Sequence, residues 1–163
     1  MELKKHLNLR FVFVGLYLVA FLAFLIYGLQ PAEAVEAYVI GSKLKIPSIG
    51  LNTDVTKLEL TENGLKTPDT IVGSYSRFEN KTLLIGHSTT IFNNLKDVKL
   101  SDKIEYNNTT YEVKTIDMLA KDKIDMDKLL KTSRQDTVVI MTCAGKLLDG
   151  GDATHRLIIT ATR

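Results

Sequence analysis

The chain has 163 residues, of which 45% are apolar and 25% are charged, a balance typical of a globular protein rather than a disordered one. Its formal net charge of +2 comes from the first ten residues, and the remainder carries equal numbers of basic and acidic side chains. This even balance predicts no basic face, so nucleic acid is not an expected partner. A single cysteine, Cys143, excludes an intramolecular disulfide, and no close Cys/His cluster supports a structural zinc site.

An uncharged N-terminal run, residues 11–29, predicts a membrane anchor. As a helix it would extend about 28 Å, close to the roughly 30 Å hydrocarbon thickness of a bilayer. A buried core helix would normally carry a polar stripe, which this run lacks. A cleaved signal peptide is the other alternative, and Ala32-Glu33-Ala34 would serve as its cleavage site. We expect a retained signal anchor.

The charges that flank this run predict its orientation. Residues 1–10 carry two lysines and one arginine against one glutamate. The positive-inside rule therefore keeps this end in the cytoplasm and places the remainder of the chain outside the cell. We expect a single-pass cell-membrane protein, with a transmembrane signal anchor at residues 11–29, a linker at 30–41 and an extracellular catalytic domain at 42–163.

The extracellular part is predicted to consist mainly of short strands. Alternating or apolar β-branched runs indicate strands, and proline, glycine and asparagine indicate their ends. The expected strands span residues 43–47, 49–55, 81–87, 103–106, 111–116, 138–143 and 156–162. Asn107-Asn108 is a hairpin signal between two of them. Seven or eight short strands with one or two short helices predict a mainly β fold, a closed or nearly closed β-barrel.

Two short helical segments are expected between the strands. Residues 91–95 follow the hydroxyls of Ser88-Thr89-Thr90, which can cap a helix. The polar connection 118–135 has acidic residues early and basic residues late, and it predicts one short helix at 126–131.

The apolar run that ends at Cys143 predicts a strand buried on both faces. A thiol at the end of such a strand is held rigidly, yet it can meet solvent or a substrate. The next strand begins at Arg156, and antiparallel pairing of the two would set Arg156 opposite Cys143, about 5 Å away. His87 ends another apolar strand, but local geometry does not determine its distance from Cys143.

These side chains suit nucleophilic catalysis. A neighbouring imidazolium lowers the pKa of a thiol from its usual value of about 8.5. Cys143 would attack a carbonyl to form a thioacyl intermediate, and His87 would give a proton to the leaving amine. Arg156 could stabilise the oxyanion or hold the substrate backbone. Thr142 offers a hydroxyl beside the nucleophile.

Each residue also has a plain structural explanation. Cys143 can be a small buried hydrophobe, His87 a turn residue and Arg156 a solvated edge charge. His155 competes with His87 as the partner of the thiol. Strand alternation sends His155 and Arg156 to opposite faces, so at most one of them lies beside Cys143. Composition and spacing alone leave open whether this thiol is catalytic or structural.

Taken in order, these segments resemble the sortases, membrane-anchored cysteine transpeptidases of Gram-positive-type cell surfaces. The resemblance covers roughly residues 42–163. It rests on Lys45–Leu51 as a first strand, Leu84–Ser88 around a histidine, Thr142-Cys143 at a strand end and Arg156 at the start of the last strand. Residues 139–143 match the Thr-Leu-x-Thr-Cys pattern of the family only in their last two positions.

The resemblance implies an eight-stranded β-barrel and a catalytic set of Cys143, His87 and Arg156. Thr142, for its hydroxyl beside the nucleophile, is a candidate substrate contact. It implies cleavage of a C-terminal sorting signal of the Leu-Pro-x-Thr-Gly type in secreted proteins. The acyl fragment would pass from a Cys143 thioester to an amine on a cell-wall precursor or another protein. Connection 118–135 falls where the family binds the sorting signal.

The resemblance also bears on cofactors and on the subclass. No cofactor is expected, and no metal site, because acidic residues that open a helical turn account for those in connection 118–135. The chain lacks the Asp-Pro-aromatic lid and C-terminal membrane segment typical of pilin-polymerising members, which favours surface anchoring.

Two alternatives stay open at this point. The same thiol could serve a hydrolase, a peptidase or esterase of the cell exterior, which would leave a free carboxylate. The chain could instead be a non-catalytic, membrane-tethered β-barrel binding module in which Cys143 is structural.

Overall fold

The computed structural model describes residues 41–62, 64–148 and 152–163. The predicted anchor, and the predicted linker up to residue 40, lie outside these residues. Within the described part, no helix is both long and apolar enough to cross a membrane.

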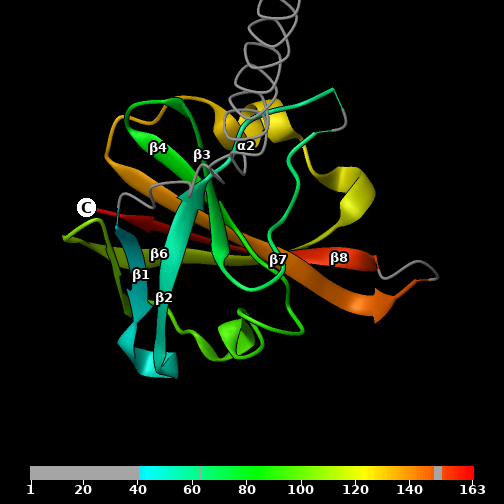
Figure 1. The fold of residues 1–163 in the computed structure, drawn as a ribbon, viewed down its shortest axis with the longest axis horizontal. Coiled ribbons are helices and arrows are strands. Elements are labelled where there is room, and N and C mark those ends of the chain that lie inside the picture. Colours follow the sequence, from blue (N-terminus) through cyan, green and yellow to red (C-terminus); the bar gives the residue numbers. More distant parts are fainter. Residues whose placement is uncertain (1–40, 63, 149–151) are drawn as a thin grey trace, which may run out of the picture. The chain divides into compact units, whose positions relative to one another are not determined.

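Eight strands close into a barrel, which confirms the predicted fold class (Figure 1). Around the barrel they follow the order β1-β2-β3-β4-β7-β8-β6-β5. The β2–β3 and β4–β7 pairs are parallel, and the other neighbours are antiparallel. The strands are β1 (Ser42–Ile46), β2 (Leu51–Lys57), β3 (Val72–Phe78), β4 (Lys81–Ile85), β5 (Lys103–Tyr106), β6 (Thr109–Ala120), β7 (Thr137–Leu147) and β8 (Ala153–Thr162).

The described helices are short and lie between the strands. They are the 3-10 turns η1 (Pro47–Ile49), η2 (Leu95–Asp97) and η3 (Lys121–Lys123), and the α-helix α2 (Met126–Leu130). Helix α2 confirms the expected helix in connection 118–135. Its N-cap is Asp125, whose carboxylate accepts a hydrogen bond of 3.0 Å from the Lys128 N–H.

The asparagine pair forms the predicted hairpin between β5 and β6. Asn107 and Asn108 have φ values of 50° and 60°, and a two-residue type I′ turn requires positive φ at both positions. The helix expected at 91–95 was wrong in its place, because turns occupy most of this segment and η2 begins only at Leu95. The Thr90 hydroxyl donates instead to the carbonyl of Asp69, 3.2 Å away.

The last two strands are longer than the sequence predicts. Strand β7 continues past Cys143, and its pairing with β8 extends to Leu147 and Ala153. Gly145 makes this possible at an irregularity in the ladder, because its φ of 78° belongs to the left-handed region that glycine adopts freely. The connecting loop is correspondingly shorter than the expected 144–154.

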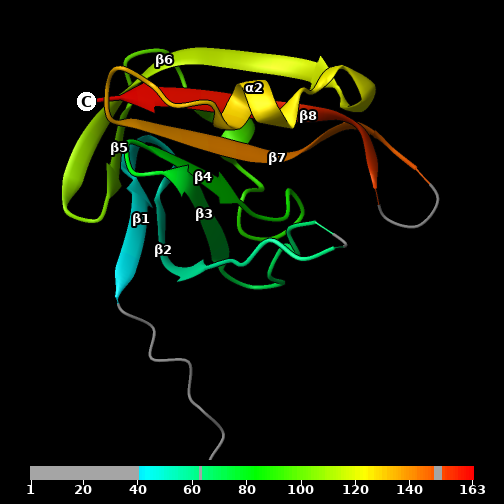
Figure 2. The same ribbon diagram turned by 90° about the horizontal axis from the view of Figure 1, so that it is seen from above.

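Strand β7 contributes to two apolar clusters, one on each face. Its inner face places Val138 and Ile140 in the barrel core with residues of β8. Its outer face places Val139 against Leu83 of β4 and Leu130 of α2. This confirms a strand buried on both faces. The long strands β7, β8 and β6 run side by side (Figure 2), and the outer face of this sheet carries the site described next.

Candidate active site

Cys143 lies on the outer face of β7 and is paired in register with Arg156 of β8. This confirms the juxtaposition predicted from strand order. The thiol is free and half-buried, and it belongs to neither apolar cluster. A side chain in that position can meet a ligand from the outside of the barrel.

His87 reaches the same place through the parallel pairing of β4 with β7. The last pair in this ladder joins Ile85 to Met141, and two residues further along lie His87 and Cys143. Side chains two apart on a strand share a face, and neighbouring strands lie about 4.8 Å apart. Both His87 and Cys143 line one cleft. Parallel pairing of β4 with β7 therefore brings His87 near Cys143, a proximity that the sequence alone did not determine.

The backbone before His87 is held from inside the barrel by Thr142. The Thr142 side chain is 4% exposed, and its hydroxyl donates a hydrogen bond of 2.8 Å to the carbonyl of Gly86. A Cβ at Gly86 would lie 2.6 Å from Ile91 and 2.8 Å from Phe92, so only glycine fits without displacing the core. These contacts hold Gly86 against the core at the point where the chain turns His87 outward.

The Thr142 bond predicts a measurable effect on folding. Thr142→Val keeps the shape but leaves a buried carbonyl without its donor, so we expect a loss of about 1–3 kcal/mol in the free energy of unfolding. Thr142→Ser retains the hydroxyl and should lie closer to the wild type. Urea denaturation of the three proteins measures the difference. Equal stability of the valine variant and the wild type would contradict the assigned bond.

The imidazole of His87 faces the exposed carboxylate of Asp69. Its Nε2 lies 3.8 Å from Asp69 Oδ1. The two side chains are 41% and 97% exposed, so solvent screens the pair and it adds little to stability. The imidazole stays accessible from the cleft.

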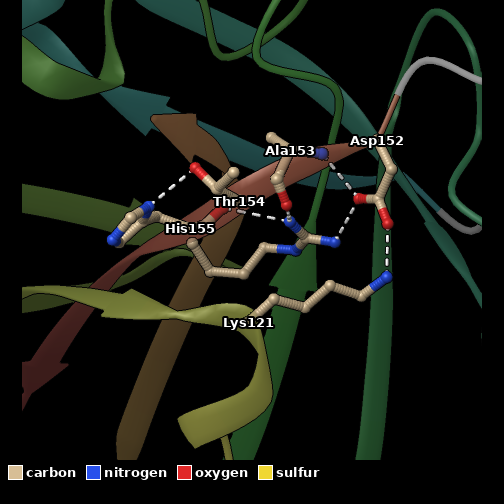
Figure 3. A network of polar contacts seen from close by, with 6 residues as sticks. Lys121, Asp152, Ala153, Thr154 and His155 are labelled. Atoms are coloured by element: carbon tan, nitrogen blue, oxygen red, sulfur yellow. Dashed lines mark hydrogen bonds and ion pairs between the residues drawn. The ribbon is translucent and has the colours of Figure 1, made fainter. Parts of the chain in front are cut away.

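Arg156 is held by polar contacts with Asp152, Ala153 and His155, the residues that Figure 3 labels together with Lys121 and Thr154. Its Nη1 donates to the carbonyls of Ala153 and His155, both at 3.0 Å, and its Nη2 donates to Asp152 Oδ1 at 2.7 Å. Asp152 also accepts from Lys121 Nζ and, at 2.8 Å, from the Ala153 N–H. These contacts, that with Lys121 foremost, hold the pKa of Asp152 well below its usual range. Asp152 is therefore charged at neutral pH.

His155 is separated from the cleft, as strand alternation predicts. Its Nδ1 lies 2.8 Å from Thr154 Oγ1. Among the described residues, the cleft is lined by His87, Cys143 and Arg156 but not by His155.

The cleft has a volume of about 780 Å³, within the usual range for ligand sites. Apolar side chains form much of its wall, namely Leu60, Leu65, Ile85, Met126, Leu130 and Met141. Thr142, Asp152, Arg77 and Asp127 also border it. An extended chain with apolar side chains would find both apolar walls and charged donors there.

The acidic residues of connection 118–135 have partners other than a metal. Asp125 caps α2, Asp127 Oδ1 lies 2.8 Å from Arg77 Nη1, and Asp122 lies 3.6 Å from Lys123. No group of three or more potential metal ligands occurs within the described ranges.

Sequence reasoning missed the polar residues that support the site. Asp152 and Lys121 hold the guanidinium of Arg156, and Asp69 faces His87. Asp152 precedes Arg156 by four residues at a loop–strand junction, a spacing that carries no regular side-chain contact outside a helix. No pattern in the sequence could have selected it.

The closed barrel therefore brings a half-buried thiol, an imidazole and a guanidinium together at one cleft. The family model described as "Sortase domain" matches residues 44–163, and the chain therefore belongs to the sortase family. Among curated proteins, none matches this chain significantly.

Solved sortase structures share the fold. The lid mutant of sortase A from Corynebacterium diphtheriae superposes with a TM-score of 0.58 at 24% identity, covering 76% of this chain and 69% of that one. Sortase A from Listeria monocytogenes gives 0.58 at 16% identity, covering 76% and 86%. Sortase C1 from Streptococcus agalactiae gives 0.59 at 23% identity, covering 80% and 70%. At these identities the likeness concerns the fold, and it does not choose between A-type and C-type members.

Proposed function

We propose that this protein is a membrane-anchored cysteine transpeptidase that cleaves a sorting signal in secreted proteins and transfers the acyl fragment to an amine at the cell surface. Membership of the sortase family supports the class of reaction. The observation that carries the mechanism is the meeting of His87, Cys143 and Arg156 at one cleft, from three different strands or strand exits. A purely structural Cys143 would account neither for its exposure nor for these neighbours.

In the acylation half, the thiolate of Cys143 attacks the scissile carbonyl carbon, and the C=O electron pair moves to the oxygen. The guanidinium of Arg156 stabilises this oxyanion by donating N–H hydrogen bonds. When the carbonyl re-forms, the C–N bond breaks, and the imidazolium of His87 gives its proton to the leaving amine nitrogen. A thioester on Cys143 and a neutral His87 result.

In the transfer half, an amine acceptor attacks the thioester carbonyl. Neutral His87 takes the proton that the amine nitrogen loses as it forms the new amide. The Cys143 thiolate leaves, which restores the starting pair of thiolate and imidazolium. The same three side chains serve both halves, and no cofactor enters the scheme.

The lining of the cleft supports a signal of the Leu-Pro-x-Thr-Gly type. Apolar walls from α2, β4 and β7 suit the leucine and proline, because burial of their side chains supplies the binding energy. Helix α2 belongs to connection 118–135, the segment expected to contact the signal. Thr142, expected to contact substrate because its hydroxyl lies beside the nucleophile, has that hydroxyl engaged with Gly86, so we assign it to positioning His87.

The proposed location follows from the sequence. The uncharged run at 11–29 would anchor the chain, with residues 1–10 in the cytoplasm and the barrel, residues 42–163, outside the cell. Its partners there would be secreted proteins that carry a sorting signal, and cell-wall precursors or proteins that offer an amine.

A product assay on the full chain in detergent tests this proposal. The protein is incubated with a panel of sorting-signal peptides and a glycine-based amine, and the products are weighed by mass spectrometry. An amine-linked fragment is expected. A free carboxylate at every amine concentration would replace transpeptidation by hydrolysis. Peptides left intact by both wild type and Cys143→Ala would favour the non-catalytic module.

A further inference from the structure

We propose that Asp152 is a positioning residue that holds the guanidinium of Arg156 beside Cys143, and that Lys121 holds Asp152 in turn. This inference rests on the proposed function, because Arg156 is the group that would stabilise the oxyanion. Neither Asp152 nor Lys121 touches the reacting atoms in the mechanism above.

The hydrogen bonds of Arg156 divide its donors into two sets. A guanidinium has five N–H donors in one plane. Three contacts are made, two from Nη1 to the carbonyls of Ala153 and His155 and one from Nη2 to Asp152. Within the described residues, the Nε–H and the second Nη2–H have no partner. These two donors are left for a substrate carbonyl, and the three anchored ones set the plane in which they lie.

Asp152 is the charged member of this anchor. Charge-assisted bonds are shorter and stronger than neutral ones, and the 2.7 Å contact with Arg156 is of this kind. The Arg156 side chain is only 15% exposed, so water competes weakly for it. With Asp152 removed, Nη1 would still meet two carbonyls, but Nη2 would lose its anionic partner and the group could rotate.

Lys121 completes the network from the 3-10 turn that follows the neighbouring strand β6. It begins η3, directly after the end of β6, where Leu119 and Ala120 pair with Arg156 and His155 of β8. Its Nζ contacts Asp152 Oδ2, while Oδ1 accepts from Arg156 (Figure 3). Two cations then share one anion, so the cluster keeps a net positive charge next to the site where the oxyanion would form. Lys121 also belongs to connection 118–135, which links this network to the segment proposed to bind the signal.

The alternative hypothesis, that Asp152 holds Arg156 away from the thiol, predicts a rise in turnover instead of a fall. If Asp152 sequestered Arg156 away from the thiol, its removal would free the guanidinium and raise turnover. The register pair Cys143–Arg156 and the two unengaged donors favour positioning instead.

Steady-state kinetics on the full chain in detergent separate these outcomes. For Asp152→Ala we expect kcat to fall about 10- to 100-fold, the range for residues that orient a functional group, with KM little changed. Asp152→Asn keeps one oxygen acceptor of the same shape but loses the charge, so it should recover only part of the loss. Lys121→Met should lower kcat less than Asp152→Ala. Asp97→Ala, at an exposed acidic residue in η2, is the matched control and should match the wild type.

A double-mutant cycle tests whether Asp152 acts through Arg156. In an Arg156→Lys background, Asp152→Ala should cause little further loss, because the group that it positions is absent. Wild-type or raised kcat in Asp152→Ala would overturn the proposal. The proposal would also be overturned if Asp152→Ala lowered kcat by the same factor in the Arg156→Lys background as in the wild type, since Asp152 would then act by a route that does not involve Arg156.

A measurement that needs no catalytic turnover tests this inference separately from the proposed function. With 15N-labelled arginine, the Nη2–H signal of Arg156, assigned by its loss in Arg156→Lys, should be shifted and slow to exchange in the wild type, because Nη2 is the donor that Asp152 accepts from. It should move to the position of exposed arginines in Asp152→Ala, with unchanged thermal unfolding. If the wild type makes no product, the proposed function fails while this signal still decides the anchoring. An unmoved signal in Asp152→Ala overturns the anchoring.

Discussion

Replacing Cys143 with alanine should abolish the thioacyl adduct and lower the rate of product formation by on the order of 10³-fold or more, the usual scale for loss of a nucleophile. Without the sulfur, the atom proposed to hold the acyl fragment between the two halves of the reaction is missing. Mass spectrometry of the intact chain, mixed with a sorting-signal peptide and no amine, measures the adduct. The same instrument measures the amine-linked product when the acceptor is present.

The fold of the Cys143→Ala variant should survive, which makes the result interpretable. Cys143 is half-buried and lies outside both apolar clusters, so its truncation opens no core cavity. Thermal unfolding should therefore match the wild type within a few degrees. Cys143→Ser keeps the side-chain size and should also fail to accumulate an adduct. Product formed by Cys143→Ala at the wild-type rate would remove Cys143 from the mechanism.

The part of the site that could be predicted from the sequence is the part set by consecutive strands. Two adjacent apolar runs joined by a short loop pair as a hairpin, so Cys143 and Arg156 could be placed opposite each other from register alone. The structure has this pair in its β7–β8 ladder. The same alternation correctly separated His155 from Arg156, since neighbouring residues on a strand face opposite ways.

The position of His87 could not be predicted in this way. It depends on parallel pairing of β4 with β7, two strands separated by about fifty residues and by β5, β6 and α2. No local turn sets the register of such a pair. It follows from closure of the whole barrel, in which both strands bury one face in the core and the other under α2.

The polar contacts of Arg156 and His87 could not be predicted from the sequence for a different reason. Lys121, Asp152 and Asp69 sit among many exposed charged residues of similar type, and only tertiary structure shows which of them meet Arg156 and His87. Thr142 was singled out for its place beside the nucleophile. Strand alternation points its side chain into the barrel. There its hydroxyl donates to the Gly86 carbonyl rather than to a ligand.

Arg156→Lys should lower kcat by about 10²- to 10³-fold, the range for removing one oxyanion donor. Lysine keeps the positive charge and can still contact Asp152. An ammonium on a flexible stem, however, cannot reproduce the planar donors that reach two carbonyls, a carboxylate and the substrate together. Single-turnover formation of the Cys143 adduct isolates the affected step, because the oxyanion forms before the acceptor amine enters.

Arg134→Lys is the matched control for Arg156→Lys, because it makes the same substitution away from the cleft. Arg134 is exposed and lies just before β7, at the end of that strand opposite to Cys143. That variant should acylate at the wild-type rate. If Arg156→Lys also acylates at that rate, a positive charge alone suffices at this position, and the planar fork has no role in the transition state. If instead only Arg156→Lys is slow, while its Cys143 still reacts normally with a small alkylating agent, the defect lies in stabilising the oxyanion rather than in activating the thiol.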